Sequence, residues 1–433
     1  MGDDLHELDC AFRYCIFTQE RTRMSDPAVD TTPSPQQIVQ AAAQIYLDFS
    51  QAPGCCIAVY DHDAFGSTGY VYPLGMSALP GSTPPPFSVT TDTVFEIGSV
   101  TKVFTSTLLA QALMMTKGGP SITDPVGKWL NYDHTYGPGQ IGSPTLYALT
   151  LQDLVTHTSG MFDQPQDLDI PYSKQLFADG QPDPKLVNWW NIYPPPPPAP
   201  QPPPPGCWQY SNIGFVTLGF AVTQMFSPDR GVNYNTILAK YITGPLGMTQ
   251  TGATIQPSWK VAQGCIGNWI QFPNPPGLIV FENNKPTGGT AFDLKTTGDD
   301  MLRFLAAQAE APNGPLGKVI QSTQMQQSKY PLCESNSHTP RVPMGLGWQM
   351  SYTQSGHAVY MKNGATSLGG FEAIVIVVPD FQCGVAVLSN QYLDASAPHP
   401  SQADLGGVAR NIIAHLHPGF GPDVPLPERD VSE

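Results

Sequence analysis

The chain has 433 residues, and its 20 Lys and Arg side chains against 35 Asp and Glu give a formal charge of −15, which argues against nucleic acid as a partner. Hydrophobic residues make up 41% of the sequence, so large buried cores are expected and a chain that is disordered throughout is excluded. Only 13% of the residues are charged while Pro and Gly number 46 and 41, which predicts many turns and long loops.

The first part of the chain predicts a helix, a strand and a second helix. Residues 1–34 show no sustained periodicity and are expected to form an extension. Residues 35–49 have apolar side chains at helical spacing, and the apolar run 55–60 that comes after them is typical of a buried strand. Ser99 then opens the run 103–116, which is apolar on most faces and predicts a central, buried helix.

The middle of the chain, residues 118–285, is rich in loops and has short helical patterns at 150–157, 212–225 and 233–244. We expect it to form a mainly helical domain inserted into the first. Ten of the twelve residues from 194 to 205 are proline, which predicts an extended polyproline helix. Only four residues separate the end of this polyproline loop from Tyr210, and we expect the loop to form a rigid rim of the active-site cleft.

The last part of the chain predicts a helix at 292–308, four strands at 345–350, 358–361, 371–378 and 384–389, and a final helix at 405–416. A helix and strand at one end of the chain, with strands and a helix at the other, indicate one antiparallel sheet assembled from both ends. The predicted fold class is α/β (α+β). Residues 35–117 and 286–420 would form a central sheet flanked by helices, and residues 421–433 a tail.

Several classes of protein are not indicated by the sequence. No apolar run reaches the roughly 20 residues that a membrane helix needs, so no membrane span is expected. The acidic N-terminus lacks a basic segment leading into an apolar stretch, so no secretory signal is visible. The eight Cys residues form no Cys-x-x-Cys pair and are expected to be scattered, mostly buried thiols. No cofactor fingerprint is found, and no metal is expected because His415 and His417 lack partner ligands.

Three short polar patterns occur in the order Ser99-Val-Thr-Lys102, Tyr210-Ser-Asn212 and Lys362-Asn-Gly364. A serine hydroxyl is a poor nucleophile until a base takes its proton, and Lys102 lies about one helical turn from Ser99 on the same face. The start of a helix also offers unpaired N–H groups that would stabilise an oxyanion. Ser99 is the only serine followed by Lys at this spacing, so it is the candidate nucleophile.

With these patterns and their surroundings, the chain resembles the serine β-lactamase and penicillin-binding-protein superfamily, in its class C β-lactamase and DD-peptidase-like branch. The resemblance extends over residues 36–417, because further segments agree in order and separation, namely 95–105, 154–160, 205–215, 245–249 and 296–304. His157 lies in one of these segments, which in this family is a structural turn, and we interpret it as structural.

The resemblance implies a serine hydrolase that forms a covalent acyl-enzyme on Ser99. Lys102 and Tyr210 would share general-base duty, and Tyr210 would later protonate the leaving group. The N–H groups of Ser99 and Ala365 would form the oxyanion hole. The residues that would bind substrate are Asn212, Lys362, Asn363, Gly364 and Ala365.

Two positions depart from the family pattern. β-Lactamases usually carry Thr or Ser at the position of Asn363, and a hydroxyl residue often stands at the position of Ala365. Their absence weakens the case for a dedicated carboxylate clamp and for efficient β-lactam hydrolysis. Lys362-Asn-Gly is closer to DD-carboxypeptidase-like relatives.

The sequence leaves three functions open. The first is cleavage of the amide bond in a β-lactam or in a D-Ala-D-Ala-like peptide. The second is an esterase, transesterase or thioesterase that uses the same serine, and the third is a slow-turnover penicillin-binding sensor.

The partner is expected to be a small molecule or a peptide, anionic because of Lys362. The family works in the periplasm or outside the cell, whereas the sequence as written would stay inside. The oligomeric state is not indicated.

Overall fold

The computed structural model describes residues 32–115, 119–130, 143–163, 177–178, 181–182, 190–191, 193, 205–226, 232–266, 290–330, 342–366, 369–393 and 404–421. Contacts divide the chain into two compact units, Met1–Ser34 and Pro35–Glu433, and the described helices and strands all belong to the second. Apart from Pro205, the predicted polyproline loop lies outside the described residues. The predicted division into a sheet domain and an inserted helical domain stays a prediction.

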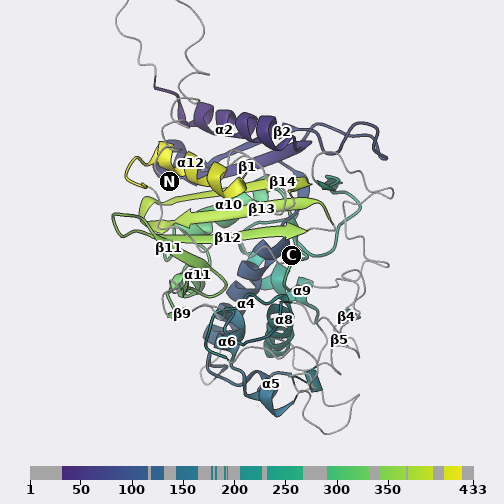
Figure 1. The fold of residues 1–433 in the computed structure, drawn as a ribbon, viewed down its shortest axis with the longest axis vertical. Helices are drawn as coiled ribbons and strands as arrows, with labels where there is room; N and C mark the ends of the chain where they lie inside the picture. The colour runs from purple at the N-terminus through teal and green to yellow at the C-terminus, as the bar shows by residue number, and fades with distance from the viewer. Residues whose placement is uncertain are drawn as a thin grey trace, which may run out of the picture. The chain divides into compact units, whose positions relative to one another are not determined.

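An eight-stranded antiparallel sheet forms the centre of this unit (Figure 1). Its strands occur in the order β2-β1-β14-β13-β12-β11-β10-β9. The bounds are β1 Gly54–Asp61, β2 Tyr70–Gly75, β9 Ser328–Tyr330, β10 Val342–Met344, β11 Gln349–Tyr352, β12 Ala358–Thr366, β13 Phe371–Val378 and β14 Cys383–Ser389. β1 pairs with β14 from Cys55↔Ser389 to Asp61↔Cys383, so both ends of the chain build one sheet, as predicted.

The sheet is buried on both faces, which explains why its central strands read as continuous apolar runs rather than alternating ones. Along β1, Cys55, Ile57 and Val59 belong to one core. Their neighbours Cys56, Ala58 and Tyr60 belong to the other core, because successive side chains of a strand point to opposite faces. Residues of β13 and β14 divide in the same way between the two cores.

Two helices from opposite ends of the chain cover one face. α2 (Pro35–Ser50) and α12 (Leu405–Leu416) pack against each other and supply apolar side chains to the same core (Figure 1). The opposite core is filled by α4 (Thr101–Met115), α8 (Asn212–Phe226) and α10 (Gly298–Ala309). α4 and α8 have little amphipathic character because both lie inside that core.

The remaining described helices are short. They are α3 His62–Phe65, α5 Pro144–Ala148, α6 Leu151–Val155, α9 Tyr234–Leu238 and α11 Gly317–Gln324. Together with α8, α6 and α9 confirm the helical patterns predicted in the middle of the chain. None of the helices within the described ranges has the length and apolar character that crossing a membrane requires.

Four sequence predictions need correction. The strand predicted at 345–350 is wrong in its first part, because residues 345–348 form the turn between β10 and β11, with a left-handed backbone at Gly347, and β11 begins only at Gln349. The helix predicted at 292–308 begins only at Gly298, because Lys295–Thr296 form β8 and the Thr297 side chain caps α10 by accepting the Asp300 N–H. The strand predicted at 358–361 continues to Thr366. Cys207 forms a disulfide rather than a free thiol. In the part of the chain that the structure describes, the buried free thiols are Cys55, Cys56, Cys265 and Cys383.

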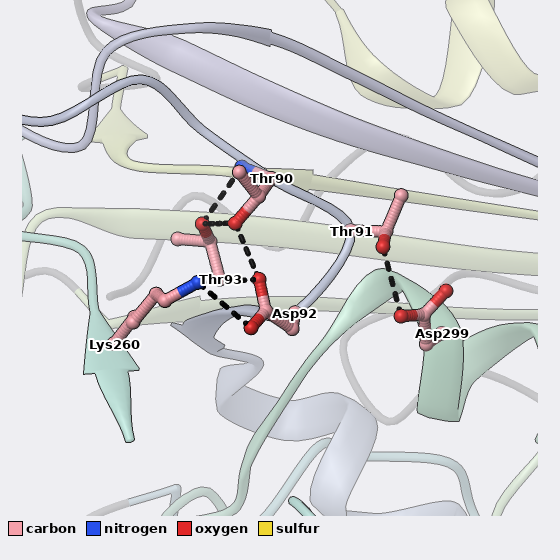
Figure 2. A network of polar contacts seen from close by, with 6 residues as sticks. All are labelled: Thr90, Thr91, Asp92, Thr93, Lys260 and Asp299. Carbon is pink, nitrogen blue, oxygen red and sulfur yellow. Dashed lines mark hydrogen bonds and ion pairs between the residues drawn. The ribbon is translucent and has the colours of Figure 1, made fainter. Parts of the chain in front are cut away.

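A polar network holds β3 (Thr93–Glu96), the strand that leads into Ser99 (Figure 2). Asp92 accepts a hydrogen bond from Thr90 at 2.5 Å and forms an ion pair with Lys260 at 3.0 Å. Thr91 Oγ1 donates to Asp299 of α10 at 2.8 Å. The ion pair is exposed and contributes little by itself. These contacts fix the start of β3 against both β6 (Lys260–Val261) and α10.

Asp61, Cys383 and His417 meet where β1 ends, β14 begins and α12 stops. The Asp61 side chain is fully buried, its Oδ2 lies 2.5 Å from His417 Nε2, and its Oδ1 accepts the Ala64 N–H at 2.8 Å. Burial alone would raise the pKa of Asp61, but the hydrogen bonds from His417 and Ala64 outweigh it and hold the pKa below its ordinary value. This pair ties the last helix to the sheet.

Removing His417 should therefore destabilise the fold. In His417→Ala the Asp61 carboxylate keeps its burial and loses a partner, and we expect the free energy of unfolding at pH 7 to fall by about 2 to 3 kcal/mol. Denaturant titration measures this, with His415→Ala, an exposed neighbour on α12, as the control. Because the folded pKa of Asp61 is depressed, its contribution is present above the ordinary carboxyl pKa of about 4 and disappears as pH falls through the folded value. Equal midpoints for His417→Ala and wild type at pH 7 would show that the pair does not stabilise the fold.

Candidate active site

Ser99 lies at a sharp junction between a strand and a helix. The short 3₁₀ turn Gly98–Val100 connects β3 to α4, and Gly98 has a left-handed backbone with φ of 47°. The Ser99 side chain is 4% exposed, so its hydroxyl sits inside the protein with its backbone N–H at the start of the helix. This is the position that the sequence predicted for a nucleophile.

Lys102, in the first turn of α4, is completely buried and surrounded by oxygen atoms. Its Nζ donates to Ser99 Oγ at 2.8 Å, to Asn212 Oδ1 at 2.5 Å and to the Ala291 carbonyl at 3.1 Å. An ammonium group removed from water costs several kcal/mol unless such hydrogen bonds replace its hydration. Three separate segments of the chain therefore converge on this one nitrogen.

Tyr210 lies just before α8, and its hydroxyl is 2.5 Å from Ser99 Oγ. Lys102 Nζ and Lys362 Nζ lie 4.7 Å and 4.8 Å from the centroid of its ring. Both ammonium groups are thus within the range of cation–π attraction, and both favour negative charge on the phenol. The first residue of α8, Asn212, is held by Asp163 Oδ1, which accepts its N–H at 3.0 Å.

Lys362 lies within β12 and is the first residue of that strand beyond its pairing with β11. β11 pairs with Ala358 to Met361 and ends there, so the part of β12 from Lys362 onwards has an edge that β11 does not cover. This edge packs against the turn that carries Ser99. Lys362 is buried, with 1% exposure, whereas Asn363 is exposed and Ala365 is half-buried.

Two glycines permit this close approach. A Cβ at Gly98 would lie 2.6 Å from the Ala365 nitrogen, and a Cβ at Gly364 would lie 2.1 Å from the Ile97 carbonyl oxygen and 2.8 Å from the Ser99 nitrogen. All of these neighbours are backbone atoms, which cannot move aside without shifting the strand or the turn. Glycine at both positions brings the backbones of Ser99 and Ala365 together.

The structure therefore brings together the side chains of Ser99, Lys102, Tyr210, Asn212 and Lys362, which the sequence had placed in separate motifs. It also adds residues that the sequence analysis did not select. Gly98 could have been found from its place before Ser99. The Ala291 carbonyl has no signal in the sequence, because any residue could supply it. The third addition is His157, predicted to be structural only.

His157 is 1% exposed and lies against Tyr210, with 4.6 Å between the ring centroids. Its Nδ1 accepts the Ser211 N–H at 3.1 Å. Burial, and after it the positive charges of Lys362 and Lys102, lower the pKa of His157 well below its ordinary value. The imidazole is therefore neutral at physiological pH.

One group among the described residues could hold a metal ion. The candidate ligand atoms of Asp61, Cys383 and His417 lie within 4.8 Å of one another. They belong to the end of β1, the start of β14 and the end of α12, elements that supply none of the residues around Ser99. His417 contacts Asp61, while the Nδ1 of its neighbour His415 lies 2.8 Å from the Asn411 carbonyl oxygen.

Comparisons with known proteins agree with this geometry. The sequence profile of the family described as Beta-lactamase matches residues 40–405. A curated relative, the Beta-lactamase of Yersinia enterocolitica, is 24% identical over 409 residues, which cover 87% of this chain and 90% of the relative.

Solved structures show the same fold. A class C beta lactamase from Rhodobacter sphaeroides has a TM-score of 0.60 and 21% identity, covering 88% of this chain and 99% of that chain. The D-alanine carboxypeptidase AmpC from Burkholderia cenocepacia has a TM-score of 0.63 and 21% identity, covering 88% and 98%. The chain belongs to the beta-lactamase family and has the α/β fold of the class C enzymes.

Adding one methyl group at Gly364 should separate β12 from the Ser99 turn. We expect Gly364→Ala to lower the rate of Ser99 acylation about 100-fold, since a displacement of about 1 Å in a catalytic group is enough for such a loss. Gly419→Ala is the matched control, because a Cβ at Gly419 meets nothing within 4 Å. Acylation is followed by the mass of the adduct formed with a reactive penicillin. An unchanged rate in Gly364→Ala would mean that the contact between these backbones is not needed for acylation.

Proposed function

We propose that this protein is a serine hydrolase that cleaves amide bonds of β-lactams or of D-Ala-D-Ala-like peptides through an acyl-enzyme on Ser99. The observation that carries the proposal is the contact of Ser99 Oγ with both Lys102 Nζ, at 2.8 Å, and Tyr210 Oη, at 2.5 Å. A hydroxyl in contact with two groups that can take its proton is an activated nucleophile. Membership of the beta-lactamase family supports the same reaction class.

The contacts around Ser99 accept two arrangements of protons. In the first, Lys102 is an ammonium ion that donates to Ser99 Oγ, Asn212 and Ala291, Tyr210 is a phenolate, and the serine hydroxyl donates to it. In the second, Lys102 is a neutral amine that accepts the serine proton, and the Tyr210 phenol donates to Ser99. Both arrangements hold the same number of protons and keep the contacts of Ser99 with Lys102 and Tyr210, so a proton can pass between Lys102 and Tyr210 through Ser99. This supports shared general-base duty.

The acylation step can be derived from this geometry. Ser99 Oγ attacks the carbonyl carbon of the substrate while its proton passes to Tyr210 or Lys102. The negative charge that forms on the carbonyl oxygen would be held by the backbone N–H groups of Ser99 and Ala365, which Gly98 and Gly364 bring close together. The leaving nitrogen then takes the proton back from Tyr210. Water then attacks the carbonyl carbon of the acyl-enzyme and gives a proton to the same base. The bond from this carbon to Ser99 Oγ breaks, and Ser99 takes that proton back.

The same site restricts the class of substrate. Buried Lys362 adds a positive charge beside Tyr210, which favours a substrate with a carboxylate or another anionic group. The names of similar proteins, a Beta-lactamase and a D-alanine carboxypeptidase, are consistent with substrates of this kind. A small-molecule or peptide substrate is therefore proposed.

Ester hydrolysis is the second candidate. Asn363 stands exposed beside Gly364, at the position where β-lactamases usually carry a hydroxyl residue. Without that hydroxyl, Lys362 has less help in holding a substrate carboxylate, and a neutral ester would lose less binding energy than a β-lactam. The reaction on Ser99 is the same for both.

Three substrates separate the candidates. Wild type and Ser99→Ala are incubated with nitrocefin, a p-nitrophenyl ester and a D-Ala-D-Ala peptide, and turnover and protein mass are followed. We expect wild type to turn over nitrocefin or the peptide and to show a transient acyl adduct, and Ser99→Ala to lose at least about 1,000-fold of the activity because the nucleophile is absent. Turnover of the ester alone would favour the second candidate. A stoichiometric adduct without turnover would indicate a sensor, and full activity in Ser99→Ala would refute the proposal.

A further inference from the structure

His157 has an unusual backbone for a buried residue. It comes shortly after α6 and has a left-handed conformation, with φ of 58°. For a residue other than glycine this conformation is unfavourable, and it persists only where surrounding contacts enforce it. The contacts that His157 makes in this conformation lead to Tyr210.

His157 accepts two hydrogen bonds, one from the residue before Tyr210 and one from the residue after it. The His157 carbonyl accepts the Gln209 N–H at 2.8 Å, and its Nδ1 accepts the Ser211 N–H at 3.1 Å. The residues immediately before and after Tyr210 are thus both bound to one residue. The imidazole also packs on the Tyr210 ring, with 4.6 Å between centroids and 34° between planes.

The second of these bonds requires a neutral imidazole. Nδ1 accepts a hydrogen bond from the Ser211 N–H, so the proton of the ring is on Nε2. Protonation would place a hydrogen on Nδ1, facing the Ser211 N–H, and would replace the bond with repulsion. The charged groups that face the ring are Lys102 from α4 and Lys362 from β12, and both disfavour a third positive charge. The rings of Trp208, Tyr210 and Phe215 also lie beside it.

The Nε2 atom of His157 is buried and has no hydrogen-bond partner among the described residues. A buried donor without a partner is unfavourable. Phenylalanine would keep an aromatic ring beside Tyr210 without such a donor, so ring packing alone does not explain an imidazole at this position. The part of the ring that phenylalanine lacks is Nδ1, which accepts the Ser211 N–H.

We propose that His157 is a positioning residue for Tyr210: its carbonyl and Nδ1 hold the backbone on both sides of Tyr210 so that the phenol oxygen stays in contact with Ser99 Oγ. The inference rests on the proposed function, because it assigns Tyr210 a part in proton transfer. His157 itself contacts neither Ser99 nor a reacting atom in this role. It acts through the placement of the tyrosine.

Two substitutions at His157 distinguish a side chain that acts as a hydrogen-bond acceptor from a ring that only packs. His157→Asn keeps an acceptor, because the Asn side-chain oxygen occupies the position of Nδ1, and Asn tolerates a left-handed backbone. His157→Phe keeps the ring and removes the acceptor. We expect kcat to fall about 100-fold in His157→Phe with little change in KM, and His157→Asn to retain most of kcat. The opposite order, with the Phe variant active and the Asn variant impaired, would show that the residue acts by packing and would overturn the proposal.

A double-mutant cycle tests whether the effect passes through Tyr210. In a Tyr210→Phe background, which removes the phenol oxygen, adding His157→Phe should lower kcat no further, since the two changes act on the same proton transfer. Independent, multiplicative losses would mean that His157 acts elsewhere and would contradict the proposal.

A structural measurement keeps the inference separate from the proposed function. Crystal structures of wild type, His157→Asn and His157→Phe should show the Tyr210 oxygen within hydrogen-bond distance of Ser99 Oγ in the first two and displaced in the third. This result does not depend on turnover. If wild type cleaves none of the three substrates, the proposed function fails while the positioning role is still tested. If Tyr210 keeps its place in His157→Phe, the positioning role fails whatever the activity.

Discussion

The site depends on one constraint, the burial of the Lys102 amino group. Its nitrogen is removed from water, and its hydration is replaced by oxygen atoms of Ser99, Asn212 and Ala291. Because a buried amino group without such partners is unfavourable, most of all in its charged form, each of these segments is held where the nitrogen needs it. The start of α4, the start of α8 and the chain before β8 therefore meet at the same point. The placement of the nucleophile follows from satisfying the hydrogen bonds of this nitrogen.

The sheet supplies the second half of the site, because part of the edge of β12 is not paired with β11. β12 extends beyond the last residue paired with β11, and the free edge that results faces the turn at Ser99. Backbone N–H groups that point out from such an edge have a fixed direction and donate to no neighbouring strand. They are therefore suited to bind a developing negative charge. Gly98 and Gly364 allow the edge and the turn to approach. A rigid sheet buried on both faces keeps this arrangement from relaxing.

Much of the fold could be predicted because its elements have strong periodicity or long apolar runs. α2, α12, β13 and β14 were predicted to within one or two residues, and pairing of the two chain ends could be inferred from their order. The start of α10 was wrong because a two-residue strand and a threonine cap leave no periodic signal. The end of β12 was wrong because Lys362 and Asn363 read as the end of a strand, although packing against the Ser99 turn continues it.

In the candidate site, too, some residues could be predicted from the sequence and others could not. Ser99 and Lys102 could be selected from their spacing on one helix face, and Tyr210 and Lys362 from the motifs that carry the family resemblance. Ala291 could not, since it acts through its carbonyl group. The contact of His157 with the backbone around Tyr210 joins residues more than fifty positions apart, and only the folded chain shows it. Cys207 was predicted as a thiol because its Cys spacing has no signature of pairing.

The most direct test of Ser99 as the nucleophile is a crystal structure of the protein with an arylboronic acid, which forms a tetrahedral adduct with an activated serine. We predict a covalent bond from boron to Ser99 Oγ, with one boronate oxygen within hydrogen-bond distance of the backbone nitrogens of both Ser99 and Ala365. A boronic acid that binds without a bond to Ser99, or an adduct whose oxygen faces neither nitrogen, would contradict this mechanism.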